Sequence, residues 1–160
     1  MSAIKAYIPE RSVKDNLGGK VRAIYDFDVH GGAVGTIDLD LKLPKGAIVS
    51  KGYLHVLTAV TTSASGTLSV GLNNTVDLLA ATAAGSLTAN AILPLEPSFT
   101  AAISSNHADG VSNSTPLLLT AERSLKVEIA TGALTAGKVA IVLEYEGSFE
   151  DVKPVTYHAV

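Results

Sequence analysis

Residues 20–43 read KVRAIYDFDVHGGAVGTIDLDLKL and hold two alternating runs on which the fold prediction rests. In residues 20–30 and again in residues 36–43, every second side chain is apolar and those between are mostly polar or charged. Alternation with a period of two is typical of a β-strand that buries one face. Glycines separate the runs and Pro44 ends the second. We expect two strands that pair antiparallel with each other.

The next segment, residues 47–61, is rich in apolar and β-branched residues on both faces. Leu54 and Val56 lie on one side of such a strand. The other side carries Tyr53, His55 and Leu57. A strand that is apolar on both faces is covered twice. We expect the domain's own second sheet on one side and assign Tyr53, His55 and Leu57 to contact with a partner, such as a sister subunit.

Further along the chain, residues 67–72 alternate again and predict another strand. Residues 75–85 predict a short helix, because Asn74 or Thr75 can cap its start, leucines and alanines fill it, and Gly85 suits its end. Residues 86–116 contain three prolines among small polar residues and predict long loops with one or two short strands.

Residues 124–130 and 138–146 alternate on either side of a turn and predict a closing hairpin. With about eight short strands and one short helix, the chain is expected to be all-β, a jelly-roll-like antiparallel β-sandwich.

The two ends of the chain lack this periodicity. Residues 1–19 are expected to form an extended N-terminal arm, residues 20–147 the β-sandwich domain, and residues 148–160 a C-terminal tail. The few apolar residues of the arm are spaced too widely for a local core and suit docking onto a partner. They are Ile4, Tyr7, Ile8 and Val13.

The composition favours an assembled protein. The 160 residues are enough for one domain with a core. Charged residues make up 17% of the chain, where about 25% is typical, and mean hydropathy is +0.33. A surface so poor in charge favours oligomerisation, which hides apolar area. The net charge of −3 is scattered without basic blocks, which argues against a nucleic-acid partner.

Several classes of chemistry and location are excluded or disfavoured. The chain has no cysteine, so disulfides, thiolate metal sites and a cysteine nucleophile are excluded. It shows no signal peptide and no apolar run long enough to span a membrane. We therefore expect no membrane partner, synthesis in the cytoplasm, and a soluble chain until assembly.

The polar face of the first two predicted strands is the strongest candidate for a chemical site. It carries Asp26, Asp28, His30, Asp38 and Asp40. Clustered carboxylates suit calcium, which takes about six to eight oxygen ligands, and paired carboxylates serve glycoside hydrolysis. Arg22 and Lys42 share the face and can neutralise the carboxylates, so a solvated, partly ion-paired surface is the simpler interpretation. We assign no metal and no cofactor.

No other motif predicts catalysis. Cupin-type enzymes cluster histidines on neighbouring strands, whereas the histidines here are far apart in sequence. They are His30, His55, His107 and His158. No G-x-S-x-G elbow is present, and the glycines of residues 31–35 precede no Walker lysine. We assign no catalytic residue and expect no enzymatic activity.

Two longer stretches have features in common with a known class of proteins. Residues 43–73 read LPKGAIVSKGYLHVLTAVTTSASGTLSVGLN, residues 77–85 read DLLAATAAG, and residues 120–147 read TAERSLKVEIATGALTAGKVAIVLEYEG. Together they cover roughly half the chain and resemble the small structural head proteins of tailed bacteriophages. The matching features are the turn at Pro44 to Gly46, Gly71-Leu72, Leu78 to Ala81, Thr120 to Arg123, Ala133 to Lys138, and Glu144 to Glu146.

The resemblance implies a capsid decoration, or cement, protein without enzymatic activity. Such a protein is a β-sandwich that forms a homotrimer on the outer surface of the virion head and bridges subunits of the major capsid protein. The arm and the tail are then the segments expected to reach the shell or a neighbour. An alternative is a tail or fibre module that binds a glycan of the host surface, using the aspartate face and calcium.

Overall fold

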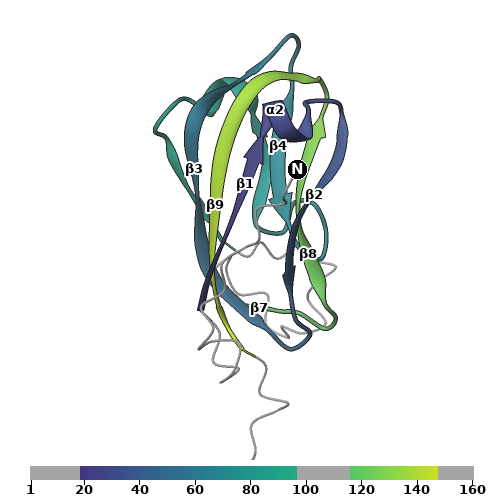
Figure 1. The fold of residues 1–160 in the computed structure, drawn as a ribbon, viewed down its shortest axis with the longest axis vertical. Helices are drawn as coiled ribbons and strands as arrows, with labels where there is room; N and C mark the ends of the chain where they lie inside the picture. The colour runs from purple at the N-terminus through teal and green to yellow at the C-terminus, as the bar shows by residue number, and fades with distance from the viewer. Residues whose placement is uncertain (1–18, 97–115, 148–160) are drawn as a thin grey trace, which may run out of the picture.

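Two antiparallel β-sheets lie face to face in the computed structural model, which describes residues 19–96 and 116–147 (Figure 1). Sheet A has the strand order β1-β9-β3-β6, with β7 also paired to β3, and sheet B has the order β2-β8-β4-β5. The strands are β1 (Gly19–Asp26), β2 (Gly35–Leu43), β3 (Ile48–Thr62), β4 (Thr67–Gly71), β5 (Leu79–Ala83), β6 (Ile92–Leu95), β7 (Leu117–Leu118), β8 (Arg123–Ala130) and β9 (Leu134–Glu146). A short helix, α2 (Phe27–His30), follows β1, and a 3-10 turn, η1 (Ala84–Ser86), follows β5.

The chain passes from one sheet to the other at almost every connection. Strands β1, β3 and β9 belong to sheet A, whereas β2, β4 and β8, which alternate with them along the chain, belong to sheet B. This wiring is that of a jelly roll. The predicted all-β, jelly-roll-like sandwich with one short helix is therefore confirmed, although the helix lies elsewhere than expected.

The core lies between the two sheets and follows the alternation in the sequence. In β1 the buried side chains are Val21, Ala23 and Tyr25, and in β3 Leu54 and Val56 are fully buried. Sheet B contributes the inward residues of β8, which are Leu125, Val127 and Ile129. A strand with one buried face needs this pattern because successive side chains point to opposite sides.

Among the described residues, no helix is long and apolar enough to cross a membrane.

The predicted pairing of the first two strands is wrong. Strand β1 pairs with β9, and β2 pairs with β8, so the two strands lie in different sheets. The predicted closing hairpin is wrong for the same reason, because β8 belongs to sheet B and β9 to sheet A. Alternation identifies the buried face of a strand, but it carries no information about which strand supplies the hydrogen bonds.

The first strand is also shorter than predicted. It ends at Asp26, whose carboxylate accepts a hydrogen bond from the backbone N–H of Asp28 at 3.1 Å and caps α2. The chain then crosses to sheet B through Gly32, where a Cβ would lie 2.3 Å from the carbonyl oxygen of Leu134. Only glycine permits this close approach, so the glycines mark a crossing between sheets instead of a hairpin turn.

The helix predicted over residues 75–85 is also wrong. That segment contains a turn, the edge strand β5 and the 3-10 turn η1. Its alanines favour a helix intrinsically, but helix propensity is a weak preference that tertiary contacts override. Here residues 79–83 pair with β4 at the edge of sheet B, and Leu78 is buried in the core.

A buried carboxylate organises the turn before β5. Asp77 is only 1% exposed and accepts backbone N–H groups from Leu72 at 2.7 Å, Asn73 at 2.9 Å and Asn74 at 3.3 Å. Burial raises the pKa of the Asp77 carboxyl, and these N–H groups oppose that shift. The turn also needs Gly71, because a Cβ there would lie 1.8 Å from the carbonyl oxygen of Asn74.

Replacement of Asp77 by alanine is expected to destabilise the domain. A buried donor without a partner costs about 1–3 kcal/mol, so Asp77→Ala should lower the free energy of unfolding by at least about 2 kcal/mol in urea titrations. Asp28→Ala is the matched control, because its carboxylate is exposed, and should change stability by less than about 0.5 kcal/mol. Equal stability of the two variants would contradict this role of Asp77.

Candidate protein-binding face

The outward side of sheet A combines an apolar centre with ion-paired ends. The register places side chains of β1, β9, β3 and β6 side by side on this surface, which we call the A face. Across its middle, Arg22 lies opposite Val142, and Val142 opposite Tyr53. The next row joins Ile24, Ala140, His55 and Ile92.

Large apolar side chains of the A face remain open to solvent. Tyr53 is 41% exposed and Ile92 is 66% exposed. Leu57, at a bulge where β3 has one residue more than β9, is 40% exposed. Val142 is only 5% exposed although it lies outside the main core, since its neighbours across the sheet flank it. The residues that define this apolar band are Ile24, Tyr53, Leu57, Ile92, Ala140 and Val142.

One end of the A face carries a three-residue ion cluster. The carboxylate of Glu144 lies 3.0 Å from Nζ of Lys20 and 3.4 Å from Nζ of Lys51. The hydrogen bond from Lys20, together with the charges of both lysines, holds the pKa of Glu144 below its ordinary value. Both lysines are well exposed, and the cluster itself has one more positive than negative charge.

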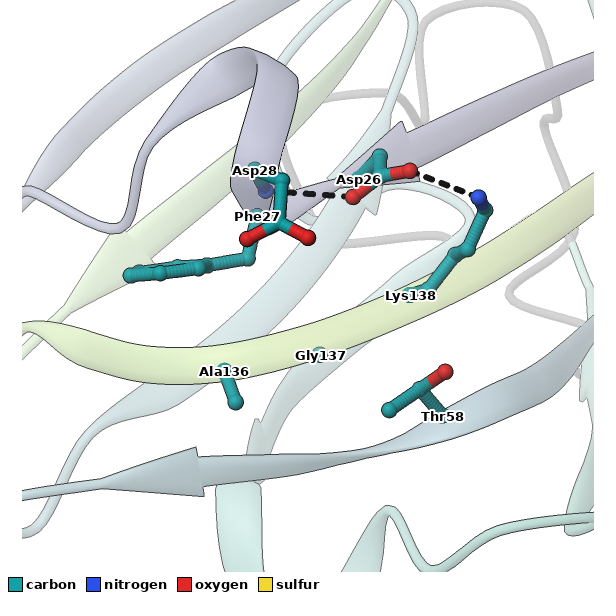
Figure 2. Close-up of a pocket in the computed structure, with 7 residues that line it drawn as sticks. All are labelled: Asp26, Phe27, Asp28, Thr58, Ala136, Gly137 and Lys138. Carbon is teal, nitrogen blue, oxygen red and sulfur yellow. Dashed lines mark hydrogen bonds and ion pairs between the residues drawn. The ribbon is translucent and has the colours of Figure 1, made fainter.

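The other end carries a second ion pair beside a small hollow (Figure 2). Asp26 lies 2.6 Å from Nζ of Lys138, and the hydrogen bond between them lowers the pKa of the Asp26 carboxyl. The hollow has a volume of about 210 Å³ and is also lined by Phe27, Asp28 and Thr58. Ligand pockets usually measure about 300–1,000 Å³, so this hollow is smaller than a typical small-molecule site.

The predicted aspartate site is divided between the two sheets. Asp26 ends β1 of sheet A and Asp28 lies in α2, whereas Asp38 and Asp40 are on β2 of sheet B. Asp28, Asp38 and Asp40 are exposed. Within residues 19–96 and 116–147, no group of three or more acidic or histidine side chains is arranged to hold a metal ion. The structure therefore does not bring the four carboxylates together.

The predicted partner-binding residues lie partly on the A face and partly outside the described residues. Tyr53, His55 and Leu57 follow one another along the A face or its bulge, and the first and last are exposed. His55 is half-buried between Ala140 and Ile92. The arm residues Ile4, Tyr7, Ile8 and Val13 lie outside the described residues, as do His107 and His158. Their roles stay predictions.

Sequence reasoning missed several residues of this surface. Ile92 lies in a segment expected to be mostly loop. Ala140 and Val142 alternate with the core residues of β9. Apolar residues on the outward side of that strand could have indicated that the A face is apolar. Lys138 was not linked to Asp26, because the pairing of β1 with β9 spans more than a hundred residues of sequence.

Comparison with known proteins finds structures of similar fold. No protein-family model and no curated protein matches the chain. A chain in the acidic stable capsid structure of Helicobacter pylori bacteriophage KHP30 is similar with a TM-score of 0.53 and 15% identity, over 81% of this chain and 87% of that chain. A chain of the cyanophage Pam1 capsid asymmetric unit is similar with a TM-score of 0.53 and 18% identity, over 81% and 86%. At these identities the likeness establishes a shared fold.

Neutralisation of Glu144 is expected to show the strength of its ion cluster. Because its folded-state pKa lies below the ordinary value of 4.5, the ionised carboxylate contributes stability above that value and loses it as pH falls through the folded-state pKa. Glu144→Gln should therefore lower the melting temperature at neutral pH, and the difference from wild type should vanish near pH 2.

Glu146→Gln provides the control for that experiment. It removes the same charge two residues further along β9, where Glu146 is exposed and forms no ion pair within the described part of the chain. The control should melt like wild type at both pH values. A Glu144→Gln effect that is independent of pH would contradict the ionic explanation.

Proposed function

We propose that this chain is a non-enzymatic structural protein of a bacteriophage virion, acting as a decoration, or cement, subunit of the head. The observation that carries the proposal is the fold, which is shared over 81% of the chain with chains in two phage capsid structures. The resemblance in residues 43–85 and 120–147 to small head proteins supports the same assignment. The proposed location is the outer surface of the capsid.

The A face is the proposed binding surface for other protein subunits. Apart from Arg22 its centre is apolar, and most of its charges are gathered at the two ends, where lysines and carboxylates form ion pairs. Burial of apolar area is the dominant favourable term in most protein association. A partner that covers the apolar band removes Tyr53, Leu57 and Ile92 from water without separating these ion pairs.

The size of the A face favours a subunit that makes several weak contacts. Strands lie about 4.8 Å apart and rise about 3.3 Å per residue, so a face of four strands and about seven residues covers roughly 400 Å². A typical stable interface buries about 800 Å² on each partner. One face is therefore a weak contact, whereas a homotrimer that presents three faces can bind major capsid subunits firmly through effective concentration.

Undecorated phage head shells offer a direct test of this function. The purified protein should have the mass of a trimer by light scattering, should bind the shells, and should raise the temperature at which they release their contents. A protein that does not bind the shells, and leaves their heat resistance unchanged, would contradict the decoration role.

Replacement of Ile92 by lysine tests the A face itself. Ile92 is 66% exposed, so Ile92→Lys should leave the fold stable but put a charge into the contact, and shell binding should weaken at least tenfold, or about 1.4 kcal/mol. Val34→Lys is the matched control, because Val34 is 59% exposed outside the A face. Equal shell affinity of the two variants, measured by sedimentation with shells, would exclude the A face as the contact.

A further inference from the structure

The four sheet edges of the described residues differ in how well they are protected. Strand β2 has a shift in register between Asp38 and Lys42 and a positive φ of 57° at Asp40. Strand β5 pairs through an irregular register, and β6 has four residues including Pro94. Bulges, short strands and prolines are devices that keep an edge from pairing. Strand β1 has none of them: its eight residues follow β9 without a shift.

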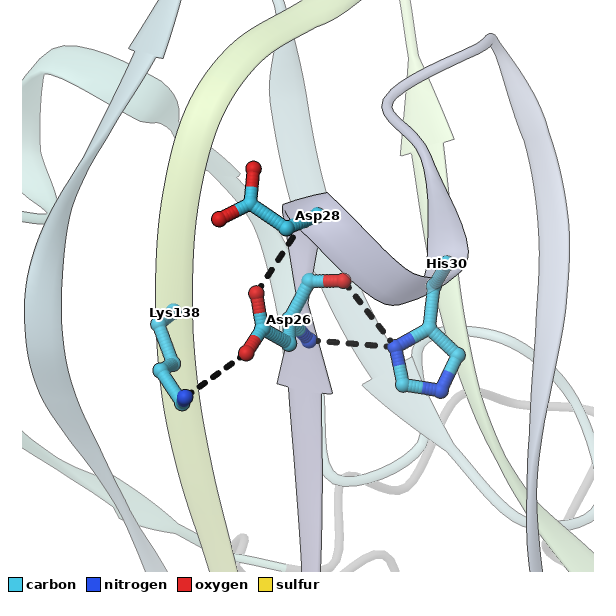
Figure 3. Close-up of polar contacts among 4 residues, drawn as sticks. All are labelled: Asp26, Asp28, His30 and Lys138. Carbon is cyan, nitrogen blue, oxygen red and sulfur yellow. Dashed lines mark hydrogen bonds and ion pairs between the residues drawn. The ribbon is translucent and has the colours of Figure 1, made fainter. Parts of the chain in front are cut away.

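The orientation of the β1 backbone follows from a contact at its end. The backbone N–H of Asp26 points at Nδ1 of His30, 3.1 Å away, and the carbonyl oxygen of Asp26 lies 3.1 Å from the same nitrogen (Figure 3). The main chain of Asp26 therefore faces away from β9. Since main-chain direction alternates along a strand and the register is regular, the backbone groups of Lys20, Arg22 and Ile24 also face away from β9.

This outer edge is open along most of its length. Within residues 19–96 and 116–147, no backbone hydrogen bond joins Lys20, Arg22 or Ile24 to a second strand. The imidazole of His30, which stacks on Tyr25 with ring centroids 5.8 Å apart, occupies the position of a partner at Asp26. His30 thus closes one end of the edge, and the open part lies towards Gly19.

We propose that the open edge of β1 binds residues 148–160 of a second copy of this chain as an added strand of sheet A. This inference rests on the homotrimer of the proposed function and specifies how its subunits are joined. Main-chain hydrogen bonds supply affinity when an extended segment adds to a sheet edge. The added strand also widens the A face, so the self-contact and the proposed shell contact are continuous.

The length and charge of residues 148–160 favour this segment as the added strand. Because Gly19 is paired with Tyr145, the segment leaves each chain close to that chain's own edge, so filling of the edge within one chain is the competing arrangement that the cross-links below distinguish. Their 13 residues can extend over roughly 40 Å. In an added strand one of Glu150 and Asp151 falls on the A face, where it complements the positive side chains of Lys20 and Arg22 beside the edge. Residues 1–18, in contrast, carry more basic than acidic side chains.

Exchange between copies suits a closed ring. Each subunit has one acceptor edge and one donor segment, which is a head-to-tail contact, and such contacts generate rings when the rotation closes. In a trimer every edge is then filled once. The same exchange covers the edge of β1, which among the described strands has neither a bulge nor a proline and would otherwise favour uncontrolled association.

Engineered disulfides can test the proposal, since the chain has no cysteine of its own. One chain carries Arg22→Cys, and a second chain of different mass carries one cysteine at a position from Phe149 to Lys153. After mixing and mild oxidation, non-reducing gels should show a cross-linked heterodimer for alternate positions only, because side chains alternate along a strand. No cross-link at any position would overturn the proposal.

Two further variants address assembly directly. Arg22→Pro removes an outward N–H that β9 does not use, and a second variant lacks residues 148–160. Both should remain folded by circular dichroism while the mass from light scattering falls threefold, and a variant lacking residues 1–18 should stay trimeric as the control.

Persistence of the trimer without residues 148–160 would overturn the proposal, and so would cross-links formed only within one chain. A monomeric wild type that still binds shells would refute the tail exchange alone, whereas a trimer that ignores shells would refute the decoration role alone.

Discussion

Pairing between β3 and β9 is the interaction on which the rest of the molecule depends. These strands have 15 and 13 residues, and their register runs from Ile48 opposite Glu146 to Thr62 opposite Leu134. Their inward side chains, among them Leu54 and Ile141, are fully buried. Their outward side chains form the middle of the A face. A slip of one residue would exchange these two sets, so the same register maintains both the core and the exposed surface.

The A face differs from an ordinary solvated surface in the arrangement of its charges. Lys20, Lys51 and Glu144 satisfy one another at one end, and Asp26 and Lys138 do so at the other. Apart from Arg22, the centre consists mainly of apolar side chains, whose exposure is unfavourable in a single molecule. This arrangement is well suited to a subunit that functions within an assembly.

The edge strands of the two sheets differ in how they are protected from pairing. A sandwich with four edges must protect each of them, and this one uses a bulge, an irregular register and a proline at three. At β1 the protection is limited to the imidazole of His30, which contacts the backbone of Asp26. The region next to it is regular and unpaired within the described residues. The unpaired backbone groups of β1 therefore border the apolar band of the A face, and a single partner could contact both.

Much of the fold could be predicted from local patterns in the sequence. The alternation of apolar residues identified β1 to β4, β8 and β9, the buried side chains Val21 and Leu54, and the position of Tyr53 on the opposite face from Leu54, because a period of two places successive side chains on opposite faces. Low charge and two-faced apolar strands also predict an assembling protein, and this stays a prediction.

The partners of each strand depended on the three-dimensional arrangement. Backbone hydrogen bonds are the same for every residue type, so the sequence does not state that β1 pairs with β9 and β2 with β8. This pairing separates Asp26 from Asp38 and places Asp26 beside Lys138 instead. It also converts the alanine-rich residues 79–83 from the expected helix into an edge strand, since the buried Asp77 and the hydrogen bonds of β4 outweigh a weak local preference.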